Sequence, residues 1–251
     1  METRKIALIM EYDGARYHGF QIQANVPTIQ GEIERALVKL TGQQIRIASA
    51  SRTDQGVHAK GQVVCFRTDS SFSPETFLRA LNHYLPEDIA VREAFQVSDD
   101  FDVRRDALSR EYYYCLLNRL TVSPLLRARA YFVPRLLDIK AMNDACQALL
   151  GTHDFLPFAS SLDGTKNTVR TVHKAEVTRE GDLVTFYMVA NSFLPHQVRN
   201  TTGALMKVGL GKSDVASFHQ ILRSKRPSTA GPALPPHGLC LLRVNYPEGV
   251  M

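Results

Sequence analysis

The feature that most constrains this chain is the order of its expected strands and helices, because that order occurs twice. In the first half, apolar periodicity predicts strands at residues 5–12, 43–50, 62–68 and 89–97, and helices at 28–40 and from Ser73 onward. In the second half it predicts strands at 110–118, 171–178, 183–190 and 238–246, and helices from Asp138, from Pro195 and over 214–223. Apart from the additional helix, both halves have the order β-α-β-β-α-β.

This order predicts an α+β protein made of two ferredoxin-like units, with helices on one face of antiparallel sheets. RNA-recognition domains share this unit, and its open sheet face receives bases. We expect one domain at residues 1–105, a second at 106–251, and an active-site cleft between them. The connections at 119–137, 152–170 and 224–237 are longer than most loops, so they are candidate functional loops.

The charge of the chain is unevenly distributed between these halves. Residues 1–105 contain 13 Lys and Arg against 14 Asp and Glu, a net charge of −1. Residues 106–251 contain 17 against 11, a net charge of +6. A basic half indicates a polyanionic partner, of which nucleic acid is the most common.

Several function classes lack their sequence signals. The longest uncharged apolar run is six residues (112–117), whereas a membrane-spanning helix needs about 20, and the apolar run near the start is too short for a signal peptide. We therefore expect a cytoplasmic protein that does not enter a membrane. The four cysteines form no C-x-x-C pair, the histidines have no metal-ligand spacing, and no dinucleotide motif occurs. We expect neither a metal nor a cofactor.

The segment 48–59 links two expected strands and places Arg52, Asp54 and His58 within seven positions. One interpretation is a surface turn, since Gly56 permits a positive φ. The other is a turn that displays Asp54 in a cleft as a nucleophile or base.

Two further segments have both a structural and a functional interpretation. Period-two alternation places Tyr112 and Tyr114 on one strand face, where they serve either core packing or the stacking of a base. Arg199 shares a helix face with the small residues Thr202 and Gly203, which would allow close packing. A partly buried arginine needs an acidic partner or a phosphate, so Arg199 belongs either to an ordinary salt bridge or to a site.

Three pairs or runs of basic residues are also candidates for contact with phosphate. They lie at 104–105, 127–129 and 223–226. A solvated charged surface is the alternative for each.

Four segments together resemble the tRNA pseudouridine synthase A (TruA) family. They are Tyr12-Asp13-Gly14 followed by Gly19-Phe20-Gln21, then Arg52-Thr53-Asp54-x-Gly56-Val57-His58-Ala59, then Arg110-x-Tyr112-x-Tyr114, and Phe193-x-x-His196-x-Val198-Arg199-Asn200. The resemblance extends over nearly the whole chain, and the second segment is long and specific. Ser51, Gln55, Pro195 and Gln197 differ from the residues that the family often has, but none of these differences removes a proposed catalytic side chain.

The resemblance implies an isomerase that converts uridine to pseudouridine at positions 38, 39 and 40 of the tRNA anticodon stem-loop. It implies that Asp54 is catalytic, that Tyr112 stacks on the target base and that Arg199 pairs with Asp54. Arg52, Tyr112 and His58 are the implied substrate-binding residues. The family also implies a homodimer and a basic tRNA-binding cleft.

The reaction breaks the N1–C1′ bond and forms a C5–C1′ bond, so it needs no group from outside the substrate. Asp54 would attack C1′ or C6, or deprotonate the sugar. A uridine stacked in RNA must be flipped out before an aspartate reaches it.

Two alternatives belong to other function classes. A non-catalytic RNA-binding protein would share the fold and charge but has no need of an acid that faces an anionic ligand, and the aromatic signature of RNA-recognition domains is absent. A nucleoside glycosidase would break the same bond but leave an abasic product.

Overall fold

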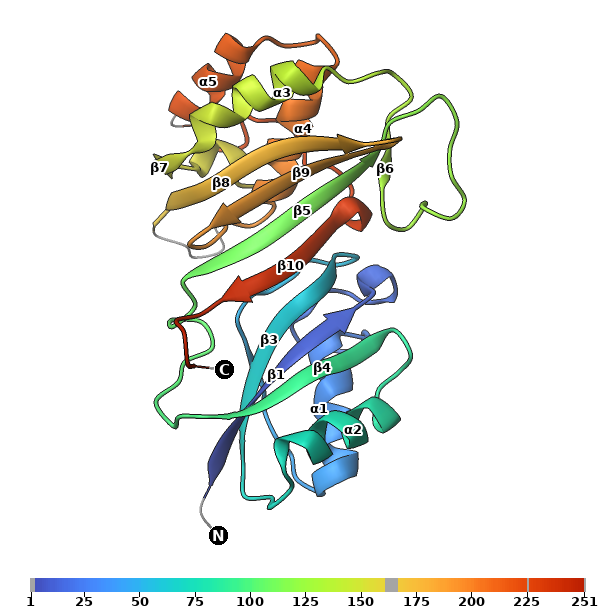
Figure 1. Cartoon of the computed structure of the whole chain (residues 1–251), viewed down its shortest axis with the longest axis vertical. Helices are drawn as coiled ribbons and strands as arrows, with labels where there is room; N and C mark the ends of the chain where they lie inside the picture. Colours follow the sequence, from blue (N-terminus) through green and yellow to red (C-terminus); the bar gives the residue numbers. More distant parts are fainter. Residues whose placement is uncertain (1–2, 161–166, 225, 251) are drawn as a thin grey trace. The chain divides into compact units, whose positions relative to one another are not determined.

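The computed structural model describes residues 3–160, 167–224 and 226–250, and its class is mixed α+β with mostly antiparallel strands (Figure 1). The chain forms two compact units, Met1–Ser109 with Leu241–Met251, and Arg110–Cys240. The predicted α+β class is therefore confirmed. The expected domains, 1–105 and 106–251, differ from these units mainly at the last strand, which packs with the first unit. Because this strand comes from the end of the chain, no single boundary in the sequence separates the two units.

The first unit is built on an antiparallel sheet with two helices. Its elements are β1 (Arg4–Tyr12), α1 (Ile29–Thr41), β2 (Ala48–Ser49), β3 (His58–Thr68), α2 (Pro74–Tyr84), β4 (Ile89–Val97) and β10 (Leu239–Asn245), with the 3-10 turn η1 (Gly14–Arg16) after β1. The strand order is β4-β1-β3-β10, and β2 pairs with β3. Both helices lie on one face of the sheet (Figure 1).

The helices of the first unit begin where the sequence predicts. The hydroxyl of Thr28 accepts the N–H of Gly31 at the start of α1, and Ser73 caps α2, with proline in its first turn. Over residues 62–68 of β3, which pair with β1 without a register shift, the even-numbered positions face the helices, because the ring of Phe66 lies edge-on to Phe77 of α2 with centroids 5.4 Å apart. The side chains of the odd positions in this segment therefore point to the opposite face.

One predicted strand of the first unit is mostly wrong. Residues 43–50 were expected to form a strand, but only Ala48–Ser49 pair with β3. The carboxylate of Glu34, on α1, accepts the backbone N–H of Ile47 and also pairs with Arg46. A side chain of the helix thus satisfies a backbone donor that a strand would have used in a ladder.

The second unit also combines an antiparallel sheet with helices on one face (Figure 1). Its elements are β5 (Ser109–Leu117), β6 (Tyr131–Phe132), α3 (Ile139–Cys146), η2 (Gln147–Leu149), β7 (Gly151–Asp154), η3 (Leu156–Phe158), β8 (Val169–Glu180), β9 (Leu183–Ala190), α4 (Gln197–Gly209), α5 (Val215–Arg223) and η4 (Pro236–Gly238). The strand order is β5-β9-β8-β7, and β6 runs parallel to the end of β5.

Local signals again predict the element ends of the second unit. Asp138 caps α3 and Asp214 caps α5 through their carboxylates. Gly181, at a φ of 56°, turns the chain between β8 and β9. The long connections contain the short strands β6 and β7, which the sequence did not predict. Residues 161–166 and Lys225 of these connections lie outside the described residues.

In the part of the chain that the structure describes, no helix is both long enough and apolar enough to cross a membrane.

Candidate active site

Asp54 lies on the turn between β2 and β3, as predicted, and is half-buried. The backbone N–H of Val57 donates to the carbonyl of Asp54 at 3.1 Å, which closes the turn. Gly56 has a φ of 76°, the left-handed conformation that glycine adopts without steric cost. Gly56 thus has the positive φ that the sequence permits, and it explains how the chain reverses two residues after Asp54.

A buried hydrogen-bond network lies beneath this turn. Gln62 of β3 is 0% exposed, and its amide donates to the carbonyl of Ser51 at 2.8 Å and to the hydroxyl of Tyr12 at 3.4 Å. The Tyr12 and Thr53 hydroxyls are 2.7 Å apart. Buried polar groups need such partners, so each member restrains the next. The network holds the residue immediately before Asp54 through its side chain.

The segment after β1 packs directly against the turn. The N–H of Phe20 donates to the carbonyl of Thr53 at 3.0 Å. A Cβ at Gly14 would lie 2.0 Å from the carbonyl oxygen of Val57, and one at Gly19 would lie 3.0 Å from that of Thr53. Only glycine permits these backbone contacts. The two glycines of the first resembling segment thus have a physical role next to Asp54.

His58 begins β3 and is 5% exposed. Its Nδ1 lies 3.2 Å from the backbone N of Gly14 and 3.1 Å from Oδ1 of Asp13. An unprotonated Nδ1 accepts from Gly14, whereas a protonated Nδ1 donates to Asp13. In either state, the ring ties the end of the turn to the segment after β1.

Arg52 has a different environment from its neighbours on the turn. It is exposed, and it makes no hydrogen bond or ion pair with any residue that the structure describes. It lines a groove on the first unit together with Phe20 and Gln21. Its guanidinium is therefore available to an anionic ligand.

Tyr112 and Tyr114 face the same side of β5, as predicted from their spacing. Their partners on β9 are Met188 and Phe186, which are both 0% exposed, so this is the side covered by helices. Tyr112 is 6% exposed, and its ring lies edge-on to Phe193 with centroids 5.0 Å apart.

Tyr114 is held more deeply in the core of the second unit. It is 0% exposed, and its hydroxyl donates to the carbonyl of Pro235 at 2.6 Å. Burial raises the pKa of this phenol. A Cβ at Gly238 would lie 2.6 Å from the Tyr114 ring. The ring is therefore enclosed, and its hydroxyl is committed to a backbone partner.

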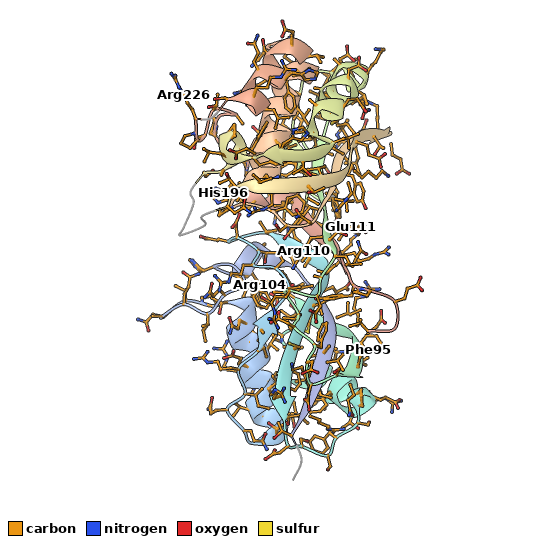
Figure 2. The ribbon with its side chains drawn as sticks, turned by 90° about the vertical axis from the view of Figure 1, so that its left-hand side faces the viewer. Phe95, Arg104, Arg110, Glu111, His196 and Arg226 are labelled. Atoms are coloured by element: carbon orange, nitrogen blue, oxygen red, sulfur yellow. The ribbon has the colours of Figure 1, made fainter. Side chains whose placement is uncertain are left out.

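Arg199 lies in the first turn of α4 and is half-buried. Its Nε donates to the carbonyl of Leu234 at 2.6 Å. On the same helix, a Cβ at Gly203 would lie 3.4 Å from the carbonyl oxygen of Pro232, which is an ordinary contact distance, so the predicted close packing of this face stays a prediction. His196, labelled in Figure 2, is the N-cap and has a left-handed φ of 61°. The backbone turns sharply there, immediately before the helix that carries Arg199.

The predicted site residues fall into two groups. Arg52, Asp54 and His58 share one turn of the first unit, and Tyr112 and Arg199 belong to the second unit. Gln62 is an important residue that the sequence reasoning missed. A glutamine inside an otherwise apolar strand was the available signal, because a buried polar side chain there needs defined partners.

The remaining candidates are surface residues and thiols. The described arginines of the three basic segments are all exposed, including Arg226, labelled in Figure 2. The four cysteines are free, and three are buried while Cys115 is half-buried. Burial raises the pKa of Cys146 to about 12, so this thiol is not a nucleophile at neutral pH. Within the described ranges, no group of three or more His, Cys, Asp or Glu could hold a metal ion.

Comparison with known proteins gives matches over almost the whole chain. The family model described as tRNA pseudouridine synthase matches residues 8–106 and 145–247. The tRNA pseudouridine synthase A of Acetivibrio thermocellus is 43% identical over 243 residues, covering 97% of this chain and 100% of that protein. The protein of that name from Geobacter sp. (strain M21) is 42% identical over 246 residues, covering 98% and 100%.

A similarity to a solved structure is much weaker. A chain of a Cbf5-Nop10-Gar1 complex is 13% identical with a TM-score of 0.33, and the match covers 81% of this chain and 54% of that chain. A score this low supports no comparison of folds.

Proposed function

Because this chain belongs to the tRNA pseudouridine synthase family, we propose that it isomerises uridine to pseudouridine in tRNA. The observation that carries this proposal is the full-length match to relatives named tRNA pseudouridine synthase A, which includes the turn that bears Asp54. We further propose that the targets are positions 38, 39 and 40 of the anticodon stem-loop.

The reaction conserves every atom of the base except for exchangeable protons. The N1–C1′ bond breaks, the uracil ring turns, and a C5–C1′ bond forms. C5 loses its proton to solvent, and N1 gains one. No electron acceptor or group donor is consumed, so side chains alone suffice for this chemistry.

We assign the essential acid to Asp54. The residue sits on a short turn whose backbone is restrained by Gln62, Phe20 and Gly56. A restrained carboxylate lies where a flipped ribose can be aligned with it, and alignment lowers the barrier of the covalent step. Loss of Asp54 should therefore abolish turnover while leaving RNA binding.

The other predicted site residues have proposed supporting roles. Tyr112 receives the flipped base, and the enclosed position of Tyr114 supports this choice between the two tyrosines. Arg199 pairs with Asp54 and aligns it. Arg52 contacts RNA where the uridine leaves the stack, which its free guanidinium supports. His58, which is buried against Gly14, contributes to substrate binding by positioning the turn.

Several finer features complete the proposal. Each unit derives from one ferredoxin-like β-α-β-β-α-β element, which the order β4-β1-β3 with β2 beside β3 supports for the first unit. The partner is tRNA in a basic cleft completed by the second domain, the protein is a homodimer, and it acts in the cytoplasm.

Tritium release from tRNA labelled at C5 of uridine tests the activity. We expect release by the unaltered protein and none by Asp54→Asn, with tRNA binding retained. Asp100→Asn is the matched control, because Asp100 is exposed and lies outside the turn. Release that persists in Asp54→Asn would overturn the assignment, and an abasic product would indicate a glycosidase.

The role of Arg199 is tested separately by Arg199→Ala. If its charge aligns the catalytic aspartate, kcat falls while tRNA binding and thermal stability are retained. Removal of the Nε hydrogen bond to Leu234 alone would lower stability without this loss of kcat. A normal kcat at normal stability would contradict the proposed pairing.

A further inference from the structure

The segment between α5 and β10 is held by side-chain donors from two other elements of the second unit. It contains Pro235 and Pro236, which have no N–H group to offer a carbonyl. The carbonyl of Pro235 accepts the hydroxyl of Tyr114, on β5, at 2.6 Å. The carbonyl of the preceding residue, Leu234, accepts Nε of Arg199, on α4, also at 2.6 Å. Two consecutive carbonyls thus connect a buried phenol with the guanidinium of a predicted site residue.

The ring of Tyr114 has a fixed position. It is 0% exposed, and its partner across the sheet, Phe186, is 0% exposed as well. A Cβ at Gly238 would lie 2.6 Å from the Tyr114 ring, so the ring packs directly against the backbone of the segment. A hydroxyl on such an enclosed ring donates in one direction only.

Tyr114 acts as a hydrogen-bond donor and not as a proton-transfer group. Burial raises the pKa of its phenol, and the positive charge of Arg199 opposes this shift, as expected of a guanidinium near the ring. The phenol therefore stays protonated at neutral pH. Its single proton is used in the bond to Pro235, so any effect of Tyr114 on the reaction passes through that backbone.

Pro235 couples the directions of the two carbonyls. The carbonyl of Leu234 precedes the Pro235 nitrogen, so its direction relative to the Pro235 carbonyl depends on the Pro235 φ and ψ, which are −53° and 148°. The proline ring restricts φ to about −65°, which leaves ψ as the one adjustable angle. A hydrogen bond to the carbonyl of Pro235 therefore restrains the carbonyl of Leu234 as well.

The guanidinium of Arg199 takes its direction from Leu234. A guanidinium is planar, so an Nε–H that points at one carbonyl restricts the directions of both Nη groups. The backbone N–H of Leu234 also donates to the carbonyl of Arg199, at 3.5 Å. The two residues are thus joined twice, and a shift of Leu234 would turn the guanidinium.

We propose that Tyr114 is a positioning residue for the isomerisation. Its hydroxyl fixes Pro235, and the carbonyl of Leu234 then directs the Arg199 guanidinium. The proposal rests on the proposed function, because it takes Arg199 as the residue that aligns Asp54. Small errors in the alignment of reacting groups cost large factors in rate, so a donor behind the arginine affects turnover without touching the substrate.

Two matched variants separate this role from a structural one. Tyr114→Phe removes the hydroxyl and keeps the ring. Tyr246→Phe is the control, because the Tyr246 hydroxyl also donates to a backbone carbonyl, that of Val103 at 2.5 Å, within the first unit. Each variant removes one phenol donor from one carbonyl. We therefore expect a similar loss of Tm, about 3 °C, in both.

The measurement is tritium release from tRNA labelled at C5 of uridine. For Tyr114→Phe we expect kcat to fall about tenfold and KM to change by less than about twofold. Tyr246→Phe should keep both constants within about twofold of the unaltered protein. A normal kcat in Tyr114→Phe, or equal losses of kcat in the two variants, would overturn the proposal.

The route through Arg199 is tested by combining Tyr114→Phe with Arg199→Lys. Lysine keeps the charge but has no Nε and no planar group, so the carbonyl of Leu234 cannot set its direction in the same way. In this background we expect Tyr114→Phe to lower kcat by less than about twofold. Single-turnover conditions, with protein in excess over tRNA, keep slow variants measurable. A further tenfold loss would show that Tyr114 does not act through the arginine.

Urea denaturation gives a readout that does not depend on activity. If Tyr114 and Arg199 are joined through the segment, the losses of unfolding free energy in Tyr114→Phe and Arg199→Lys should not add in the double variant. Additive losses would contradict the coupling. Absence of tritium release by the unaltered protein would instead refute the proposed function, while the denaturation data still report on the link between the two residues.

Discussion

The turn that carries Asp54 and the helix that carries Arg199 are held in place by different kinds of contact. The turn depends on specific polar partners, above all the buried amide of Gln62, and on backbone contacts that exclude any Cβ at Gly14. Helix α4 depends on side-chain packing, and a Cβ added at Gly203 would lie at ordinary contact distance from its neighbours. A buried polar partner cannot be replaced by an apolar one without cost, whereas a packed surface adjusts slightly. We therefore expect the turn to be far less tolerant of substitution than the helix.

The substitution Gly14→Ala should have the largest effect. Its Cβ would lie 2.0 Å from the carbonyl oxygen of Val57, and backbone must move to relieve this overlap. We expect the free energy of unfolding to fall by about 3 kcal/mol, measured by urea denaturation. Tritium release should fall strongly because the displaced backbone belongs to the catalytic turn. Normal stability with normal activity would show that the turn is not fixed by this contact.

The substitution Gln62→Leu should have the next largest effect. It leaves the carbonyl of Ser51 without its 2.8 Å donor inside the protein. An unsatisfied buried group costs about 1–3 kcal/mol, so we expect a loss of about 2 kcal/mol and a lower kcat. Gln220→Leu, at an exposed position of α5, is the control and should change neither. If Gln62→Leu lowered stability but not kcat, the network would be structural only.

The substitution Gly203→Ala should have a small effect. The added Cβ would lie 3.4 Å from the carbonyl oxygen of Pro232 and 3.6 Å from the Leu234 side chain, which can adjust. Alanine in place of glycine inside a helix gains about 1 kcal/mol, which offsets that adjustment. Calorimetry should show a change in stability within about 1 kcal/mol. A loss as large as that of Gly14→Ala would remove the contrast between the two regions.

The smallest effect concerns a feature that both units share, an aspartate whose carboxylate accepts backbone N–H groups. Backbone N–H groups hold the pKa of Asp102 in the first unit and of Asp214 in the second below its usual value. A carboxylate whose pKa is lower in the folded chain than in the unfolded chain stabilises the folded state when the pH is above the unfolded-state pKa. This contribution to stability is lost as the pH falls through the folded-state pKa. We expect Asp102→Asn and Asp214→Asn each to lower Tm slightly at neutral pH.

The same two variants make a pH-dependent prediction. Their Tm difference from the unaltered protein should shrink as the pH falls from about 4 through the lower pKa of the folded state, because both carboxylates become protonated over this range. A difference that stays constant down to pH 2 would show that the N–H contacts do not depend on the charge.

Sequence reasoning predicted the features that depend on neighbouring residues. Ser73, Asp138 and Asp214 identify helix starts because a capping oxygen bonds N–H groups two or three residues ahead. The shared face of Tyr112 and Tyr114 follows from strand geometry alone. The turn around Asp54 was predictable for the same reason, since Gly56 marks its reversal.

Features that depend on distant residues were not predicted. The strand expected at 43–50 is mostly absent because Glu34 takes a backbone donor from it. The short strands β6 and β7 form only because β5 and β8 provide edges for them. The last strand joins the first unit, which no local pattern in residues 239–245 indicates.

The sequence by itself determined the element order, the helix caps, the turn that carries Asp54 and, through its motifs, the family. These depend on contacts within a few residues or on a pattern of residue types. Only the tertiary structure decided that Gln62 supports the turn and that Gly14 must be glycine. The physical reason is that buried hydrogen bonds and close backbone contacts join residues that are far apart in the chain, and composition and periodicity carry no information about such pairs.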